Sequence, residues 1–173
     1  MSDTGAALPD IYVDADACPV REEVARVADR LSLRAFFVSN GSRPIAPPRS
    51  LNVTMIRVGA GSDEADDWIV ERIAADDVCV TADIPLASRC LKKGAYAVTP
   101  SGKAWTDANI GSALAGREIA RHLRELGETT GGPPPFTKAD RSRFLQALDT
   151  AVQAARRSRA KRAATPPPAA TTG

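Results

Sequence analysis

The sequence has few of the residues that disulfide frameworks, zinc knuckles or membrane spans require. Its three cysteines (Cys18, Cys79 and Cys90) are an odd number without close pairing, which argues against a disulfide framework and a zinc knuckle. No apolar run approaches the roughly 20 residues of a membrane-spanning helix. Residues 1–10 combine neither a basic start nor an apolar stretch, so we expect no secretory signal. These absences favour a protein of the reducing cytoplasm.

Positive charge is scarce over most of the chain and concentrated near its end. The formal net charge is +2, so no global basic field indicates a nucleic-acid partner. Five cations precede a stretch rich in proline, alanine and threonine: Arg156, Arg157, Arg159, Lys161 and Arg162. Without them the body is acidic by about three charges, and such a body needs a metal ion or a local basic rim to bind a polyanion. The cluster itself is either a solubilising tail or a source of sequence-independent affinity for nucleic acid.

Short apolar runs alternate with helical patterns along the chain. Strands are predicted at residues 11–13, 35–38, 53–58, 78–80 and 96–98. Helices are predicted from Pro19, from Ser62 or Asp63, from Pro85, over residues 108–126, and from a capping box at Thr137 and Asp140. This alternation predicts right-handed crossovers and an α/β three-layer sandwich with a mostly parallel central sheet.

The composition divides the chain into three parts. Residues 1–10 are predicted to be a flexible N-terminus, 11–154 an α/β domain, and 155–173 a disordered tail. Helical spacing predicts two sets of inward residues: Ile110, Leu114, Leu123 and Leu126 in the fourth helix, and Phe144, Leu148 and Val152 in the last.

Aspartates follow two of the predicted strands. Asp14 and Asp16 come after the first strand and Asp83 after the fourth. Parallel strands end at the same edge of an open sheet, where ligands bind, so these side chains should lie there together. Asp63, Asp66 and Asp67 occupy one face of the first turn of a helix that begins at the same edge.

Two explanations compete for these aspartates. Helix capping accounts well for any single one, because a carboxylate at a helix N-terminus accepts free N–H groups. It accounts poorly for the whole set, because gathered carboxylates repel one another. Mg²⁺ or Mn²⁺ with oxygen ligands would relieve that repulsion. Two such ions roughly 4 Å apart can activate water for attack on a phosphodiester.

Several polar residues are candidates for contact with a substrate, although each alone is more often an ordinary surface residue. Ser39 and Asn40 end the second strand at the same edge and are placed to contact a phosphate or ribose. Trp105, on a loop after the fifth strand, either stacks a base or covers the core. The candidate rim cations are Arg43, Arg49, Lys103 and Arg117.

Three stretches, Val13–Val20, Gly61–Asp67 and Thr81–Ala87, resemble the YaiI/YqxD family of bacterial proteins, and the resemblance covers roughly residues 11–150. It implies a PIN-like fold and a ribonuclease-like, metal-dependent activity. The acids of that superfamily correspond to Asp14, Asp83 and either Asp66 or the neighbouring Asp63 and Asp67. Related sites often have a second acid soon after the fourth strand. Residues 84–87 supply none, so Asp16 or the Asp63 group would complete the site.

The leading hypothesis is a divalent-metal-dependent nuclease that acts on single-stranded RNA in preference to DNA. Asp14, Asp16 and Asp83 are the predicted catalytic residues, and the predicted metal ligands are Asp14, Asp63, Asp66, Asp67 and Asp83. One alternative is a non-catalytic nucleic-acid- or protein-binding module with an acidic metal pocket. Another is a haloacid-dehalogenase-like phosphatase, whose first motif resembles residues 14–16, although no suitably placed lysine or later acid pair follows. No pattern indicates a membrane or a particular protein partner.

Overall fold

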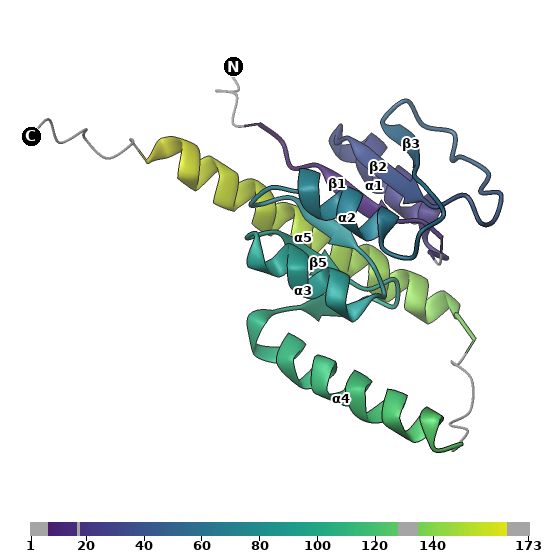
Figure 1. Ribbon diagram of the computed structural model, residues 1–173. Coiled ribbons are helices and arrows are strands. Elements are labelled where there is room, and N and C mark those ends of the chain that lie inside the picture. The colour runs from purple at the N-terminus through teal and green to yellow at the C-terminus, as the bar shows by residue number, and fades with distance from the viewer. Residues whose placement is uncertain (1–6, 17, 128–134, 166–173) are drawn as a thin grey trace, which may run out of the picture.

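The structure, a computed structural model, describes residues 7–16, 18–127 and 135–165. In this part of the chain, strands and helices alternate for most of the length (Figure 1). The strands are β1 (Ile11–Asp14), β2 (Ala35–Ser39), β3 (Val53–Arg57), β4 (Val78–Val80), β5 (Tyr96–Val98) and β6 (Ala104–Trp105). The helices are α1 (Arg21–Leu31), α2 (Glu64–Arg72), α3 (Ile84–Lys92), α4 (Asp107–Glu125) and α5 (Lys138–Ala164).

The strands form one sheet in the order β3-β2-β1-β4-β5-β6. β1 to β5 are parallel, which confirms the predicted α/β class with a mostly parallel sheet. β6 pairs antiparallel with β5, so Trp105 lies on a strand rather than on the predicted loop. Gly102 permits the intervening turn, because its φ is +91° and a Cβ there would lie 2.5 Å from the backbone of Arg143. We call the edge where the parallel strands end the carboxyl edge.

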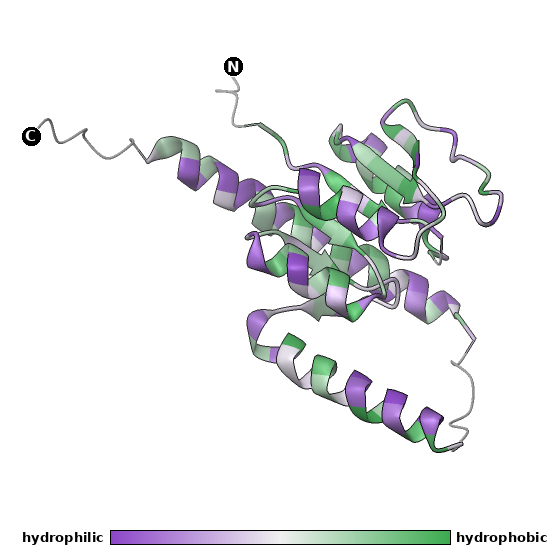
Figure 2. Cartoon of the chain, in the orientation of Figure 1, coloured by the Kyte–Doolittle hydropathy of each residue, from purple (hydrophilic) through white to green (hydrophobic). Residues whose placement is uncertain are grey.

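Helices cover both faces of the sheet and give it three layers. On one face, residues of α1 and α5 pack against Ile11 and Val13, among them Val24, Phe144 and Leu148. On the other face, residues of α2 and α3 pack against Tyr12 and Cys79, among them Ala65, Ile69 and Leu86. Side chains alternate along a strand, so Asp14 points to the same face as Tyr12, toward α2 and α3. Figure 2 shows the hydrophobic strands between these helices.

Helix α4 packs more loosely than its sequence pattern predicts. Ile110 is the one buried residue of this helix, whereas Leu114 and Leu123 are partly exposed. Leu126, just beyond the helix, is 66% exposed, so its predicted inward position is wrong. Figure 1 shows α4 beside α3 and set away from the sheet, and these two helices are in contact. One side of α4 is therefore available to border a cleft.

Helix α5 extends further than the domain boundary that composition predicts. It continues to Ala164, so the predicted disorder is wrong for residues 155–164, and residues 166–173 lie outside the described residues. Ala155 is fully buried, and Arg159 forms an ion pair with Asp77, just before β4. The basic end of α5 therefore lies at the opposite edge of the sheet from the carboxyl edge.

The N-terminal stretch is also more ordered than predicted where the structure describes it. Pro9 is buried, the backbone N–H of Asp10 donates to Asp77, and the Asp10 carboxylate pairs with Arg34. Residues 1–6 of the predicted flexible segment lie outside the described residues. Within the described ranges, the helices are too short or too polar for any of them to traverse a lipid bilayer.

Candidate active site

Two neighbouring parallel strands place aspartates at the carboxyl edge. Asp14 is the last residue of β1, and Val13 beside it is in register with Val80 at the end of β4. Thr81 follows β4 directly. Its hydroxyl donates to Oδ2 of Asp14 (3.0 Å) and accepts from the backbone N–H of Asp83 (3.0 Å). Thr81 therefore fixes the positions of the two acids relative to each other.

Asp83 has a capping role as well as a place in the acidic group. Its Oδ1 accepts from the backbone N–H of Leu86 (2.9 Å) at the start of α3, with Pro85 in the first turn. Capping uses this oxygen, and Oδ2 accepts no hydrogen bond from the described residues. Asp63 is the N-cap residue of α2, but its side chain makes no capping hydrogen bond. Capping thus explains one oxygen of Asp83 and leaves the side chain of Asp63 unexplained.

Asp66, in the first turn of α2, completes an acidic cluster with Asp14 and Asp83. Burial raises the pKa of Asp66 from 3.8 to about 6, and the charges of Asp83, Asp14 and Asp63 add to this effect. The pKa of Asp14 is also raised, chiefly by burial, and the Thr81 hydrogen bond opposes that increase. The charges of Asp83 and Asp14 raise the pKa of Asp66, and the charge of Asp83 raises the pKa of Asp14. We call Asp14, Asp66 and Asp83 the carboxyl-edge cluster.

Asp16 lies next to this cluster on the β2 side, where two donors orient its carboxylate. The hydroxyl of Ser39 donates to Oδ1 (2.7 Å), and the backbone N–H of Asn40 donates to Oδ2 (2.9 Å). Ser39 is buried and also accepts from the N–H of Gly41 (3.1 Å), while the Asn40 side chain accepts from Ser42 (2.9 Å). These contacts occupy Ser39 and Asn40, two of the residues predicted to bind substrate. In this structure Ser39 and Asn40 position Asp16.

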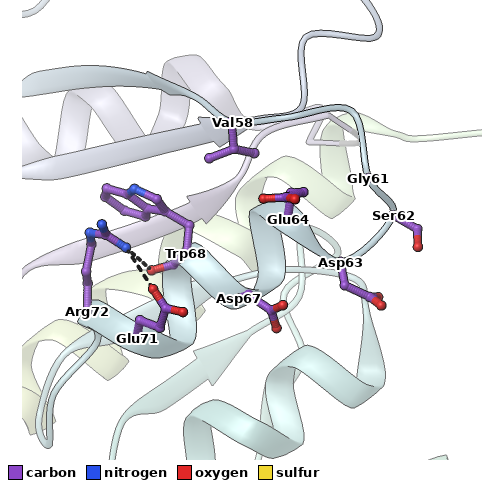
Figure 3. A pocket seen from close by; sticks show the side chains of 9 residues that line it. All are labelled: Val58, Gly61, Ser62, Asp63, Glu64, Asp67, Trp68, Glu71 and Arg72. Carbon is purple, nitrogen blue, oxygen red and sulfur yellow. Dashed lines mark hydrogen bonds and ion pairs between the residues drawn. The ribbon is translucent and has the colours of Figure 1, made fainter.

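Asp67 lies apart from the cluster. Its Oδ1 is 2.9 Å from Nη1 of Arg89 on α3, and both side chains are substantially exposed. Figure 3 shows Asp67 pointing away from Trp68 on α2. Asp63 and Asp67 line a hollow of about 440 Å³ whose lining does not include Asp14, Asp66 or Asp83. Of the two, Asp63 helps to raise the pKa of Asp66, whereas Asp67 forms an exposed ion pair with Arg89.

The chemistry of the cluster suits a hard divalent cation. Carboxylate oxygens are the ligands that Mg²⁺ and Mn²⁺ favour, and a cation would relieve the repulsion that helps to raise the pKa of Asp66. Within residues 7–16, 18–127 and 135–165, no three acidic, histidine or cysteine side chains are gathered closely enough to hold a metal ion. The oxygen donors are of the type that such an ion prefers, but their arrangement in this structure would have to converge before they could hold one.

A cleft of about 710 Å³ lies between the cluster and α4. Asp14 and Asp83 line one side of it. The α4 side is formed by Ala113, Gly116, Arg117, Ala120 and Arg124. Arg117, a candidate from the sequence, therefore shares the cleft with two of the acids. Lys103 does not line this cleft, because its Nζ lies over the ring of Trp105, 4.7 Å from the centroid.

Two residues of this region have signals in the sequence that aspartate spacing alone does not reveal. Thr81 is the first residue after an apolar strand, a position from which a hydroxyl can reach the neighbouring strand. Arg124 is seven residues after Arg117, and two helical turns bring both onto one face. A hydroxyl at a strand end and cations at helical spacing are the two signals that the sequence carries for these residues.

The fold defines an α/β domain with an open, mostly parallel sheet, and proteins of this class commonly bind ligands beyond the carboxyl ends of the strands. Residues 12–154 match the family described as uncharacterised and named YaiI/YqxD. The chain belongs to this family, which confirms the resemblance seen in the motifs around the aspartates. Kinship with PIN-like domains stays a prediction.

Similar proteins occur in several bacteria and are described as UPF0178 proteins. The one from Azorhizobium caulinodans is 54% identical over 142 residues, which cover 82% of this chain and 88% of the relative. The one from Rhodospirillum rubrum is 51% identical over 150 residues, covering 87% and 99%. A third, from a Caulobacter species, is 54% identical over 147 residues, covering 85% and 96%. These names state no activity, and no solved structure matches the chain.

Proposed function

We propose that this protein is a divalent-metal-dependent nuclease that hydrolyses phosphodiester bonds, with RNA favoured over DNA. One observation carries the proposal: Asp14 ends β1, Asp83 caps α3 just after β4, and Asp66 lies in the first turn of α2, so all three acids belong to the carboxyl edge. Their charges contribute to the raised pKa of Asp66. Two of these acids face arginines across a cleft. The acids repel one another, and a bound metal ion would relieve that repulsion. The arginines across the cleft suit a phosphate, so the arrangement favours a site for a metal ion and a phosphodiester.

Each member of the group has a distinct role in this proposal. Asp14, Asp66 and Asp83 hold Mg²⁺ or Mn²⁺, and Asp63 is near enough to Asp66 to assist. A cation bound there supplies an activated water and neutralises charge on the phosphodiester. Asp16, oriented by Ser39 and Asn40, positions the attacking water. Thr81 holds Asp14 and Asp83 at a fixed separation.

The cysteines suit a reducing compartment, and we place the protein in the cytoplasm on that ground. Cys18, Cys79 and Cys90 are all free and buried. Burial raises the pKa of Cys18 to about 11, so this thiol stays protonated beside the site and is no rival nucleophile to an activated water.

The direct test is cleavage of a labelled single-stranded RNA, in Mn²⁺ or in chelator, by the wild-type protein and by Asp83→Asn. Asparagine is as good an N-cap as aspartate, so α3 should keep its start while the cluster loses a charge. We expect metal-dependent cleavage by the wild type and its loss in Asp83→Asn. The matched control is Asp67→Asn, which removes an acid paired with Arg89 outside the cluster and should retain cleavage.

A folded wild-type protein that cuts no RNA with Mn²⁺ or with Mg²⁺ would contradict the proposal. So would an Asp83→Asn variant that cuts as fast as the wild type. Metal-independent binding of RNA without cleavage would favour the non-catalytic module instead. Release of phosphate from small monoesters would favour the phosphatase.

A further inference from the structure

A second cleft with two arginines lies on the β2–β3 side of the carboxyl-edge cluster. It has a volume of about 500 Å³, and its lining includes Ser39, Arg43, Ile45 and Arg57. Arg57 is the last residue of β3 and is in register with Ser39, whose hydroxyl holds Asp16. Neither arginine forms an ion pair with a described residue. The second cleft therefore offers two guanidinium groups without an ion-pair partner among the described residues, and it shares Ser39 with the hydrogen bond that orients Asp16.

In the order of the strands, the end of β1 lies between this cleft and the one along α4. Ser39 and Arg57 point to the α1 and α5 face of the sheet and Asp14 to the other face, so a strand that contacts both must cross the carboxyl edge. The strand ends run from Arg57 on β3 through Ser39 on β2 to Asp14 on β1, and then to β4. Neighbouring strands are about 4.8 Å apart, so the ends of β3 and β1 are separated by roughly 10 Å. A phosphate bound near Arg57 and a phosphate bound at Asp14 would therefore belong to different nucleotides.

The cleft along α4, on the β4 side of the acids, is also lined by two arginines. Arg117 and Arg124 are seven residues apart on one helix face, which separates their Cα atoms by about 10 Å along the axis. Neither forms an ion pair with a described residue, whereas Arg121 pairs with Glu125 at 3.5 Å. The other α4 residues that line this cleft are small (Ala113, Gly116 and Ala120), and a Cβ added at Gly116 would meet no atom within 4 Å. The wall therefore combines two free cations with room for a sugar and a base.

We propose that the two clefts bind phosphates on either side of the scissile bond of a single-stranded polynucleotide, so that cleavage occurs within the chain. This inference rests on the proposed function and specifies its substrate. The order of charges, cation then acid then cation, suits a polyanion that continues in both directions from the reacting phosphate. Each cleft has the size of a small-ligand site, which suits separate nucleotides of one strand rather than a duplex.

Binding to an uncleaved strand tests this path without requiring turnover. The Asp83→Asn protein is titrated in chelator with a labelled single-stranded RNA of about twelve nucleotides, across a range of KCl concentrations. The same background carries three further pairs of substitutions: Arg117→Gln with Arg124→Gln, Arg43→Gln with Arg57→Gln, and Arg156→Gln with Arg157→Gln. The last pair is the control, because that part of α5 lies at the opposite edge of the sheet.

Each phosphate contact to a single strand contributes about 0.7 to the slope of log K against log salt concentration. We expect each cleft pair to lower the slope by about 1.4, with weaker binding, while the control pair leaves it unchanged. In the wild-type background with Mn²⁺, an end-labelled RNA should give internal fragments from the earliest times. Thermal melting confirms that these exposed substitutions leave the fold intact.

Unchanged slopes for either cleft pair would overturn the inference, as would an equal loss in the control pair or an absence of binding. Failure of the proposed function gives a different pattern. If the slopes change as expected but the wild type cuts no RNA with Mg²⁺ or Mn²⁺, the result supports RNA binding in both clefts and contradicts the proposed nuclease activity. If the wild type cuts RNA but the salt slopes of the cleft variants do not change, the result supports the nuclease activity and contradicts RNA binding in the two clefts.

Discussion

The hydroxyl of Thr81 joins Asp14 to the backbone of Asp83 across the boundary between β1 and β4. It donates to the Asp14 carboxylate and accepts from the Asp83 N–H, and both donor–acceptor distances are 3.0 Å. The Thr81 residue is 1% exposed. A buried hydroxyl that is satisfied in both directions holds two repelling carboxylates at a set distance. The first prediction concerns the loss of this contact.

Replacing Thr81 with valine keeps the shape and removes the hydroxyl. The Asp83 N–H then loses its acceptor and Asp14 loses a donor, which should lower the free energy of unfolding by about 1–3 kcal/mol. The pKa of Asp14 should rise further, because its hydrogen bond with Thr81 now lowers it. Urea denaturation and the pH profile of metal-dependent cleavage measure both effects.

Thr99→Val is the matched control for that substitution. Thr99 is also buried, and it follows β5 as Thr81 follows β4, but its hydroxyl contacts Ser101 and the Lys103 N–H in a turn. The Thr99→Val variant should be less stable than the wild type, but the pH profile of its metal-dependent cleavage should not shift. Equal shifts of the profile in both variants would contradict a special role for Thr81.

Asp66 should make the metal-free protein less stable as the pH rises. Its pKa is raised from 3.8 to about 6, so between these values the folded protein binds more protons than the unfolded chain. Stability is therefore lost as the pH rises through this window. Because the carboxyl is partly exposed, solvent screening reduces the effect, and Asp66→Asn should gain about 1 kcal/mol at pH 7.5. The difference from the wild type should vanish below pH 3.8.

Urea denaturation of both proteins at acidic and neutral pH measures that difference. Mn²⁺ should stabilise the wild type at pH 7.5 and have little effect on Asp66→Asn. Asp67→Asn, one residue along α2, should show no gain, because Asp67 is exposed and paired with Arg89. A wild type that is more stable than Asp66→Asn at neutral pH without metal would be inconsistent with repulsion in the cluster.

The end of α5 should contribute to stability through Arg159. Its guanidinium contacts Asp77, whose side chain is 3% exposed and also accepts from the N–H groups of Asp10 and Ala74. Arg159→Met removes a charged donor from a buried carboxylate and should cost about 1–3 kcal/mol. Arg157→Met, on the exposed side of the same turn, should change stability by less than about 0.5 kcal/mol. Thermal or urea unfolding that does not separate the two variants would indicate a solvated tail.

The sequence allows the sheet and the positions of its acids to be predicted because both depend on local patterns. Asp14 and Asp83 each follow an apolar run, and parallel strands bring such positions to one edge. The same local patterns predict the Thr137 capping box and the buried Phe144 and Leu148, which the structure confirms.

Features that depend on distant contacts could not be predicted in this way. Helical spacing shows which residues of α4 share a face, but not whether another element covers that face, and Leu126 is exposed. The basic run after residue 154 has the composition of a solvated tail. Its order depends on Asp77, more than 80 residues earlier in the chain. β6 is only two residues long, and the turn before it requires the close approach of Gly102 to α5.

The most direct test of the central claim is a calorimetric titration of the metal-free protein with Mn²⁺ at pH 7.5, with Asp14→Asn and Asp67→Asn titrated in parallel. The account predicts saturable binding by the wild type and by Asp67→Asn, and loss of that binding in Asp14→Asn. Equal binding by Asp14→Asn and the wild type, or no binding by a folded wild type, would contradict a metal site at the carboxyl edge.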